Sequence, residues 1–198
     1  MDSASGLTKA KLRLALRKSQ AGKTVEAAQI LEEVAKFDPQ GGYVWVEYAR
    51  VLKELRRFDE AEVAFKRALR YAPKERKTHV LASLGLLYEQ TRGYAAAVES
   101  YREAIAHMYA PVAWVHILYG NALFMLGDVA AAEEIFCLAA SVDSEERVEA
   151  YENLALIYRS QKKYEDAMRH AEKALEICPD SEVAKSVATS LDGIERLP

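Results

Sequence analysis

Residues 148–181 carry the pattern on which this chain is built: VEAYENLALIYRSQKKYEDAMRHAEKALEICPDS. Its small and large apolar positions are Tyr151, Leu154, Ala155, Tyr158, Tyr164, Ala167, Ala171, Ala174 and Pro179. The same order of residue types stands earlier in the chain at Trp45, Tyr48, Ala49, Leu52, Phe58, Ala61, Phe65, Ala68 and Pro73. Five such stretches follow one another every 34 to 36 positions. A period of this length indicates a stack of helical hairpins.

Each repeat unit is expected to contain two helices. The units fall at 8–41, 42–75, 78–111, 113–146 and 148–181. Trp45, Tyr48 and Leu52 share one helical face with Ala49, since their spacings are 3, 4 and 7. Turns are expected at Gly22, Gly93 and Gly127, where positive φ can end a helix, and at Leu55-Arg56-Arg57. Proline cannot continue a helix, so unit boundaries are expected at Pro39, Pro73, Pro111 and Pro179.

Small residues recur where two helices of a hairpin must cross closely. On the first helix they are Ala49, Gly85, Gly120 and Ala155, and on the second Ala27, Ala61, Ala97, Ala132 and Ala167. One turn after the second set stand Leu31, Phe65, Tyr101 and Phe136, which are expected to fill the gap between neighbouring hairpins. A single hairpin would leave one apolar flank exposed to solvent, so the stacking of hairpins is what stabilises this fold.

The two ends of the chain are expected to differ from the repeats. Residues 1–7 are predicted to be a flexible tail, and 182–198 to form a capping helix and tail. We expect Val183, Val187, Leu191 and Ile194 to form the stripe that covers the last hairpin. Arg76, Lys77, Val112 and Arg147 are read as additional residues between units.

Composition sets further bounds. The chain has 198 residues, 51% hydrophobic and 29% charged, which is globular composition. No apolar run of about 18 residues and no signal peptide are seen, so a cytoplasmic location is expected. Cys137 and Cys178 lie in different repeats without metal-ligand spacing, which argues against a disulfide framework or a metal site.

Charge is distributed unevenly along the chain. Residues 1–77 hold 17 Lys and Arg against 11 Asp and Glu, whereas the remainder holds 10 against 19. A basic half followed by an acidic half could steer an oppositely polarised partner, or could join two copies head to tail. The simpler alternative is a solvated helical surface.

Position for position, the pattern resembles the tetratricopeptide repeat, over about nine tenths of the chain. The residues in register are Trp45, Leu84, Gly85, Tyr88, Gly120, Tyr158, Tyr94, Ala97, Tyr101 and Ala104. The resemblance implies an all-α fold, a right-handed α-solenoid superhelix of antiparallel helix hairpins. The first unit departs from the family pattern at Lys11, Leu31 and Val34.

The resemblance also implies a concave groove lined by the first helices of the hairpins. Its partner-binding residues would be Leu12, Arg13, Leu16, Tyr43, Val46, Glu47, Arg50, His79, Leu86, Trp114, Ile117, Leu118, Asn121, Phe124, Met125, Glu149, Glu152, Asn153 and Leu156. Lys9, Lys53, Ala82, Ser83, Glu89 and Arg159 occupy further groove positions. The groove would be basic early, apolar in the middle and acidic late.

The middle of this groove is more apolar than packing within its hairpin requires. Tyr119, Gly120, Leu123 and Ala132 already supply that hairpin's core. We expect a peptide or amphipathic helix of a partner protein to be anchored near Trp114 and Phe124. The alternative is that these residues pack locally or beneath the last helix.

Catalytic motifs are not seen in the sequence. It has no Gly-rich phosphate loop, His-Glu-x-x-His helix, Cys-x-x-Cys pair or nucleophile elbow, so we predict no enzyme activity, cofactor or metal. The carboxylate clamp with which some family members bind chaperone tails is also missing, because its places hold Leu12, Leu16, Glu47, His79 and Ser83. Basic residues form no single stripe for nucleic acid. The prediction is an adaptor or chaperone-like module, and the alternative is a self-assembling scaffold joined through its repeat ends.

Overall fold

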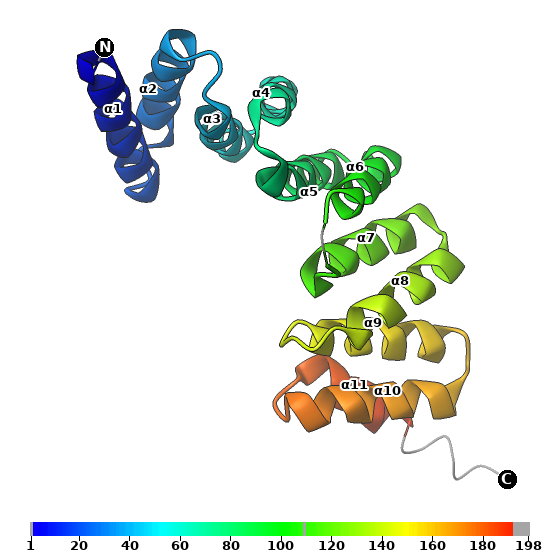
Figure 1. The fold of residues 1–198 in the computed structure, drawn as a ribbon. Helices are drawn as coiled ribbons and strands as arrows, with labels where there is room; N and C mark the ends of the chain where they lie inside the picture. Colours follow the sequence, from blue (N-terminus) through cyan, green and yellow to red (C-terminus); the bar gives the residue numbers. More distant parts are fainter. Residues whose placement is uncertain (1, 109, 192–198) are drawn as a thin grey trace, which may run out of the picture. The chain divides into compact units, whose positions relative to one another are not determined.

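The computed structural model describes residues 2–108 and 110–191, and for residues 2–5 it describes the backbone only. In this part of the chain every regular element is an α-helix (Figure 1). The helices are α1 (Asp2–Gln20), α2 (Thr24–Phe37), α3 (Gly42–Glu54), α4 (Phe58–Tyr71), α5 (Lys74–Gln90), α6 (Tyr94–Ala106), α7 (Ala113–Leu126), α8 (Val129–Ser141), α9 (Arg147–Ser160), α10 (Tyr164–Ile177) and α11 (Glu182–Leu191). The predicted solenoid of five helical hairpins and one further helix is confirmed.

The hairpins are grouped in two compact units, Met1–His107 and Met108–Pro198. The N-terminal unit holds α1 to α6, and its core includes Leu31, Trp45 and Phe65. The C-terminal unit holds α7 to α11, and Ala171 and Val187 belong to a core cluster between its last helices. Within each unit the helices that follow one another pack side by side, so each hairpin covers a flank of its neighbour.

Two glycines allow an aromatic ring to lie directly on the backbone of the paired helix. A β-carbon on Gly85 would lie 2.5 Å from Cε1 of Tyr101, and one on Gly120 would lie 2.6 Å from Cε1 of Phe136. Both rings are fully buried. The predicted requirement for small residues at these crossings is therefore confirmed.

Tyrosine hydroxyls join successive hairpins within each unit. Tyr88 on α5 donates to the Glu62 carboxylate on α4 over 2.9 Å, and Tyr158 on α9 donates to Glu133 on α8 over 2.7 Å. The two pairs occupy equivalent repeat positions. Each links the first helix of a hairpin to the second helix of the preceding one, so it fixes how the two hairpins are set against each other.

All five hairpin turns use one backbone conformation. A residue with positive φ comes directly before the N-cap of the second helix: Gly22 (73°), Arg56 (60°), Arg92 (59°), Gly127 (92°) and Lys162 (61°). The prediction for Gly93 is wrong in this respect, because its φ is −83° and Arg92 takes the left-handed position instead. A non-glycine residue there costs about 1–2 kcal/mol, which the packing of both helices must offset.

The first and third hairpins begin earlier than the sequence predicts. Helix α1 starts at Asp2, so the backbone of 2–7 is helical instead of a tail. Extending an existing helix costs little once it is nucleated, and no proline interrupts this segment. Helix α5 starts directly after Pro73 and so includes Arg76 and Lys77, which were expected between units.

The last helix buries Val187 and Leu191 as predicted, but its inward stripe differs from the predicted one at one position. Ala184, Val187 and Leu191 are buried, whereas Val183 is exposed, and Ile194 lies outside the described residues. Ser181 sets this rotation: its Oγ accepts from the backbone N–H of Ala184 at 3.0 Å and donates to Glu152 at 2.5 Å. The cap fixes α11 on α9, which places residue 184 inward instead of residue 183.

Gly120→Ala is expected to destabilise the C-terminal unit by about 1–3 kcal/mol, because Phe136 must move away from the new methyl group. Urea unfolding followed by circular dichroism measures this effect. Gly6→Ala is the matched control, since a β-carbon at Gly6 in α1 meets nothing within 4 Å and alanine favours the helix. Equal unfolding midpoints for the two variants would contradict the close-crossing argument.

Candidate functional site

The N-terminal unit has a hollow of about 530 Å³ between α3 and α5. Its lining includes Tyr43, Val46, Glu47, Arg76, His79, Val80 and Ser83, together with Tyr71 at the end of α4 and Pro73 from the connection between hairpins. Five residues that the family resemblance placed in the groove, Tyr43, Val46, Glu47, His79 and Ser83, thus lie around one hollow. It is formed by two first helices, as expected for the groove face.

Tyr43 forms a wall between this hollow and a second one. The second hollow, about 430 Å³, lies between α1 and α3 and is lined by Thr8, Lys9, Leu12, Phe37, Asp38, Gly41, Tyr43 and Val44. Tyr43 is 45% exposed, and the guanidinium carbon of Arg76 lies 5.8 Å from the centre of its ring. An aromatic ring held in this way between two hollows can contact a partner at little cost in side-chain entropy.

The charged groups beside Tyr43 are already paired. Arg50 donates to the Glu47 carboxylate from Nε at 3.1 Å and Nη2 at 2.8 Å, and from Nη1 to Glu54 at 3.2 Å. Burial, and then the nearby Glu47 carboxylate, raise the pKa of Tyr43. Its hydroxyl therefore stays protonated near neutral pH and remains a hydrogen-bond donor.

Several other predicted residues of the N-terminal groove do not line either hollow. Arg13 is exposed, and Leu16 and Leu86 are half-buried, but none of the three lines either hollow. Ala82 is 2% exposed, so its prediction as a groove residue is wrong. Position 82 lies at the border between the groove face and the packing face of the helix. In this chain its side chain is buried on the packing face.

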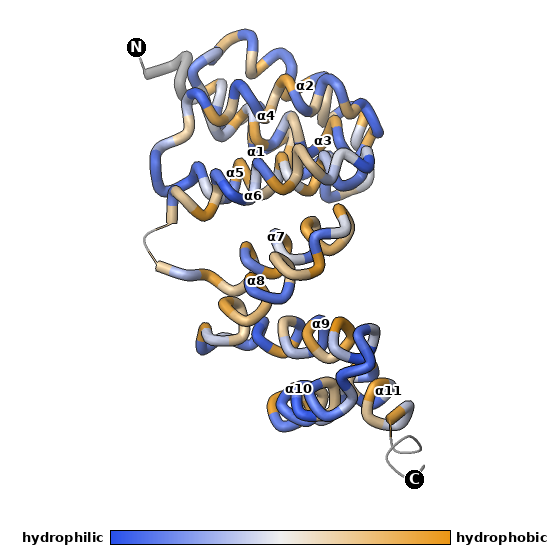
Figure 2. The backbone as a smooth tube through the Cα atoms, turned by 90° about the vertical axis from the view of Figure 1, so that its right-hand side faces the viewer, coloured by the Kyte–Doolittle hydropathy of each residue, from blue (hydrophilic) through white to orange (hydrophobic). Residues whose placement is uncertain are grey.

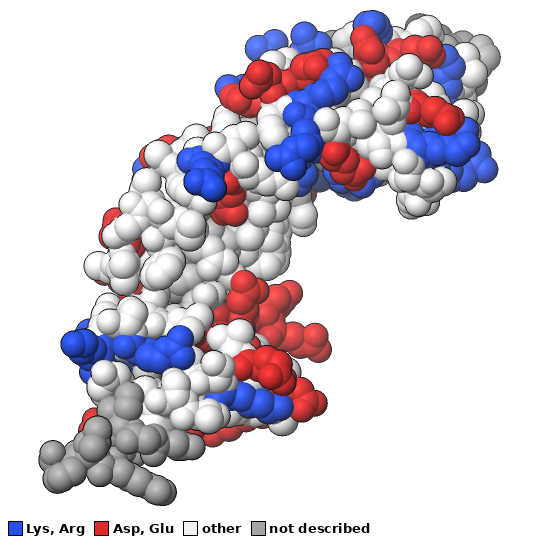
Figure 3. Space-filling view, turned by 180° about the vertical axis from the view of Figure 1, so that it is seen from behind, with Lys and Arg blue, Asp and Glu red and all other residues white. Residues whose placement is uncertain are grey.

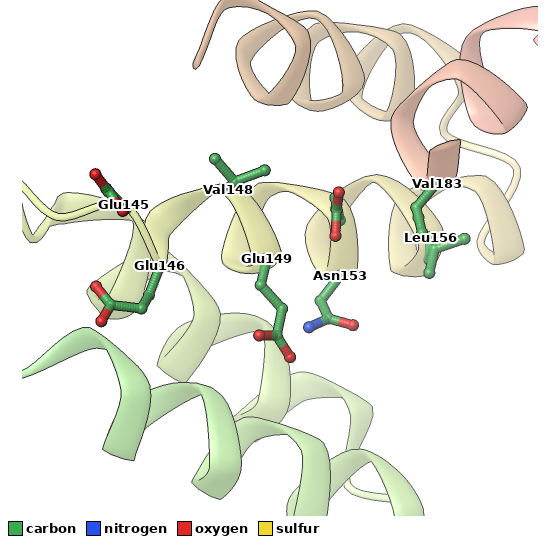
Figure 4. Close-up of a pocket in the computed structure, with 8 residues that line it drawn as sticks. Glu145, Glu146, Val148, Glu149, Asn153, Leu156 and Val183 are labelled. Atoms are coloured by element: carbon green, nitrogen blue, oxygen red, sulfur yellow. The ribbon is translucent and has the colours of Figure 1, made fainter. Parts of the chain in front are cut away.

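In the C-terminal unit a hollow of about 560 Å³ follows α9. It is lined by Glu145, Glu146, Val148, Glu149, Glu152, Asn153 and Leu156, with Val183 from α11 (Figure 4). Four of these, Glu149, Glu152, Asn153 and Leu156, were predicted groove residues. Glu149 and Asn153 extend from α9 on the side of the α7–α8 hairpin (Figure 4). The other four were missed, because they lie outside the first-helix positions that the family pattern designates: Glu145, Glu146, Val148 and Val183.

Helix α7, which packs beside α9, supplies an apolar surface. Phe124, Met125 and Leu126 are 44%, 55% and 50% exposed, and Trp114, Leu118 and Asn121 are half-buried. Ile117 is only 3% exposed, so its prediction as a groove residue is wrong. Like Ala82, it is buried on the packing face of its helix. The tube of α7 carries long hydrophobic runs, whereas that of α10 is mostly hydrophilic (Figure 2). On the face shown in Figure 3, acidic side chains of the C-terminal unit gather beside an area with few charges.

Side chains with catalytic or metal-binding chemistry are scattered. Among the described residues no group of three or more His, Cys, Asp or Glu could hold a metal ion. Nδ1 of His116 and Nδ1 of His170 lie 2.9 and 2.8 Å from carbonyl oxygens of their own helical turns, which is a structural role. Within the same described ranges no helix has the length and hydropathy needed to cross a membrane.

Family comparison identifies the class of protein. Three family models, each described as "Tetratricopeptide repeat", match residues 19–84, 82–144 and 148–181. Together they cover well over half of the chain, which belongs to the tetratricopeptide repeat family. Members of this family generally bind other proteins. None of the curated proteins matches the sequence.

Solved structures agree with this fold. "YrrB: a TPR protein with an unusual peptide-binding site" is 16% identical, with a TM-score of 0.73 over 95% of this chain and 98% of that one. "MamA 41-end from Desulfovibrio magneticus RS-1" is 19% identical, with a TM-score of 0.76 over 92% and 99%. The "APC/C hetero-tetramer Cut9-Hcn1" is 19% identical, with a TM-score of 0.65 over 96% of this chain and 37% of that one. At these identities the likeness shows the fold alone.

Glu89, a predicted groove residue, serves an inward contact instead. The fully buried Tyr101 donates its hydroxyl proton to the Glu89 carboxylate over 2.9 Å. Burial raises the pKa of Glu89 above its ordinary value, although this hydrogen bond acts the other way. A carboxyl whose pKa is higher in the folded chain than in the unfolded one stabilises the fold at low pH, and this stability is lost as pH rises through the folded value.

Glu89→Gln is therefore expected to raise the melting temperature at pH 7, because the amide oxygen still accepts from Tyr101 without burying a charge. The gain should shrink at pH 4, where the wild-type carboxyl is largely protonated. Thermal unfolding at both pH values measures this difference. A melting temperature lowered equally at pH 7 and pH 4 would contradict the assignment of burial as the dominant effect.

Proposed function

We propose that this chain is a non-catalytic protein-interaction module that holds a peptide or amphipathic helix of a partner protein on the first-helix faces of its hairpins. The observation that carries the proposal is the hollow between α3 and α5, where Tyr43, Val46 and His79 meet. An adaptor or chaperone-like role in the cytoplasm is part of this proposal.

The chemistry of this hollow supports a polypeptide as ligand. It combines an apolar floor at Val46 and Val80 with a hydroxyl donor at Tyr43 and a cation at Arg76. A peptide offers the matching groups, since its side chains can fill the apolar part while its carbonyl oxygens accept from the donors. The second hollow on the other side of Tyr43 lengthens the surface along the unit, as an extended or helical segment requires.

Val46→Glu is expected to reduce partner capture from native lysate at least about tenfold, because a carboxylate would have to be desolvated against Val80 and the Tyr43 ring. Quantitative mass spectrometry of proteins retained by the wild-type and variant chains measures this loss. Val25→Glu is the matched control, since Val25 is 60% exposed on α2 and faces neither hollow. Equal capture by the two variants would sink the proposal.

A second candidate function is self-assembly, and the charges of the two units favour it. The N-terminal unit carries 19 Lys and Arg against 14 Asp and Glu, a net charge of +5, and the C-terminal unit carries 8 against 16, a net charge of −8. Opposite charges on the two units of one chain would attract the ends of two copies to each other.

The two functions differ in how particle size depends on concentration and salt. A scaffold is expected to grow as protein concentration rises and to dissociate between about 50 and 500 mM salt, because screening weakens attraction between exposed charges. An adaptor is expected to keep one size throughout. Light scattering over both ranges measures this, and a constant monomer mass would exclude the scaffold.

A further inference from the structure

We propose that the C-terminal unit takes one kind of partner segment: an amphipathic helix with an apolar stripe and a face rich in Lys and Arg. This inference rests on the proposed function and names the chemistry of the partner. It is drawn from two sets of side chains on the first helices of the same unit, the exposed apolar residues in the last turn of α7 and the carboxylates at the start of α9, which a helix of about 18 residues and about 27 Å is long enough to span.

Exposed apolar side chains of α7 provide the anchoring surface: Leu118 and Met125 share one face of the helix, and Phe124 and Leu126 stand on either side of it in the last turn. Phe124, Met125 and Leu126 are about half exposed, and Leu118 is half-buried on the same helix. Aromatic and methionine side chains of this kind are enriched in the centres of protein interfaces, and methionine adapts to the shape of a partner side chain. A stripe of apolar residues along a partner helix would cover them.

The acidic surface of α9 provides charge. Glu145, Glu146 and Glu149 are exposed, and none of the three forms an ion pair within the described ranges. The nearby cations are engaged elsewhere, since Arg147 pairs with Asp143 at 2.7 Å and Arg159 donates to Ser190 over 3.3 Å. The position of these carboxylates at the start of α9 also suits the helix dipole, so their effect on folding must be measured separately.

Nothing cationic in the sequence between these surfaces offsets the acidic groups. No Lys or Arg stands between Arg102 and Arg147, so α7, α8 and the turn between them contribute only Asp128, Glu133 and Glu134 as charged neighbours. An acidic partner helix would be repelled here, whereas a basic one would be attracted before contact and oriented on contact. Charge complementarity therefore selects a basic occupant.

The test uses the full chain and three synthetic peptides of about 18 residues, which form five helical turns. The first has a leucine stripe and a lysine face, the second has the same stripe and a glutamate face, and the third scrambles the first so that the stripe is lost. Fluorescence anisotropy of labelled peptides measures binding. The lysine-faced helix is expected to bind at least tenfold more tightly than either of the others, and less tightly as salt is raised.

Two variants and their matched controls locate the site. Phe124→Ser is expected to weaken binding of the lysine-faced peptide about tenfold, and so is the triple change Glu145→Gln, Glu146→Gln and Glu149→Gln. The controls are Leu138→Ser, which removes a similarly exposed apolar side chain from α8, and the triple change Glu165→Gln, Glu172→Gln and Glu176→Gln on α10. Both controls should bind as the wild type does. Circular dichroism and melting temperature confirm that each variant is folded.

Each remaining outcome overturns the inference in a recognisable way. Equal binding of the lysine-faced and glutamate-faced peptides, still lost with Phe124→Ser, would refute the basic partner while leaving groove binding intact. Equal weakening by the α9 and α10 triple changes would reveal unspecific attraction. No binding of any peptide, or an effect of the α9 change on self-association alone, would refute the inference, and the Val46→Glu capture experiment would then decide the proposed function by itself.

Discussion

The fold depends on one close contact that recurs along the chain, the packing of a large side chain of the second helix against a small residue of the first. Gly85 beneath Tyr101 and Gly120 beneath Phe136 show it in its tightest form, because even a methyl group would overlap the ring. Burying such a ring contributes roughly 1.5–3 kcal/mol. A hairpin gains this free energy of burial only when a neighbouring hairpin covers its other flank. The repeats therefore stabilise one another within each unit.

Because packing occupies the flanks of each hairpin, the remaining face of each first helix is free for binding. The flanks of each hairpin are occupied by packing and by the hydrogen bonds from Tyr88 to Glu62 and from Tyr158 to Glu133. On the remaining face Tyr43 is 45% exposed and Val46 is only partly buried against the core, so packing constrains these positions less than it constrains the flanks. Specificity can therefore differ from unit to unit while the repeat pattern stays constant.

Most of the fold and about half of the candidate site could be predicted from the sequence. Periodic spacing predicted the five hairpins, because helical geometry fixes which positions share a face. The resemblance to the tetratricopeptide repeat then placed several of the residues that line the hollows beside Tyr43 and along α9. Details that depend on one local contact were missed. The Ser181 cap turned Ala184 inward in place of Val183, Arg92 took the left-handed turn position expected for Gly93, and Ile117 was covered by packing. A repeat pattern carries no information on such single contacts.

The two candidate surfaces differ in what their charges can do. Beside Tyr43 the Glu47 carboxylate is already bound by Arg50, and the Arg76 guanidinium lies over the tyrosine ring. Such pairs orient a ligand at short range but attract it little from a distance. Along α9, Glu145, Glu146 and Glu149 are uncompensated, so their field reaches about one Debye length into the solvent. The N-terminal unit is thus suited to recognition by shape and hydrogen bonding, and the C-terminal unit to recognition by charge, although both are built from the same repeat.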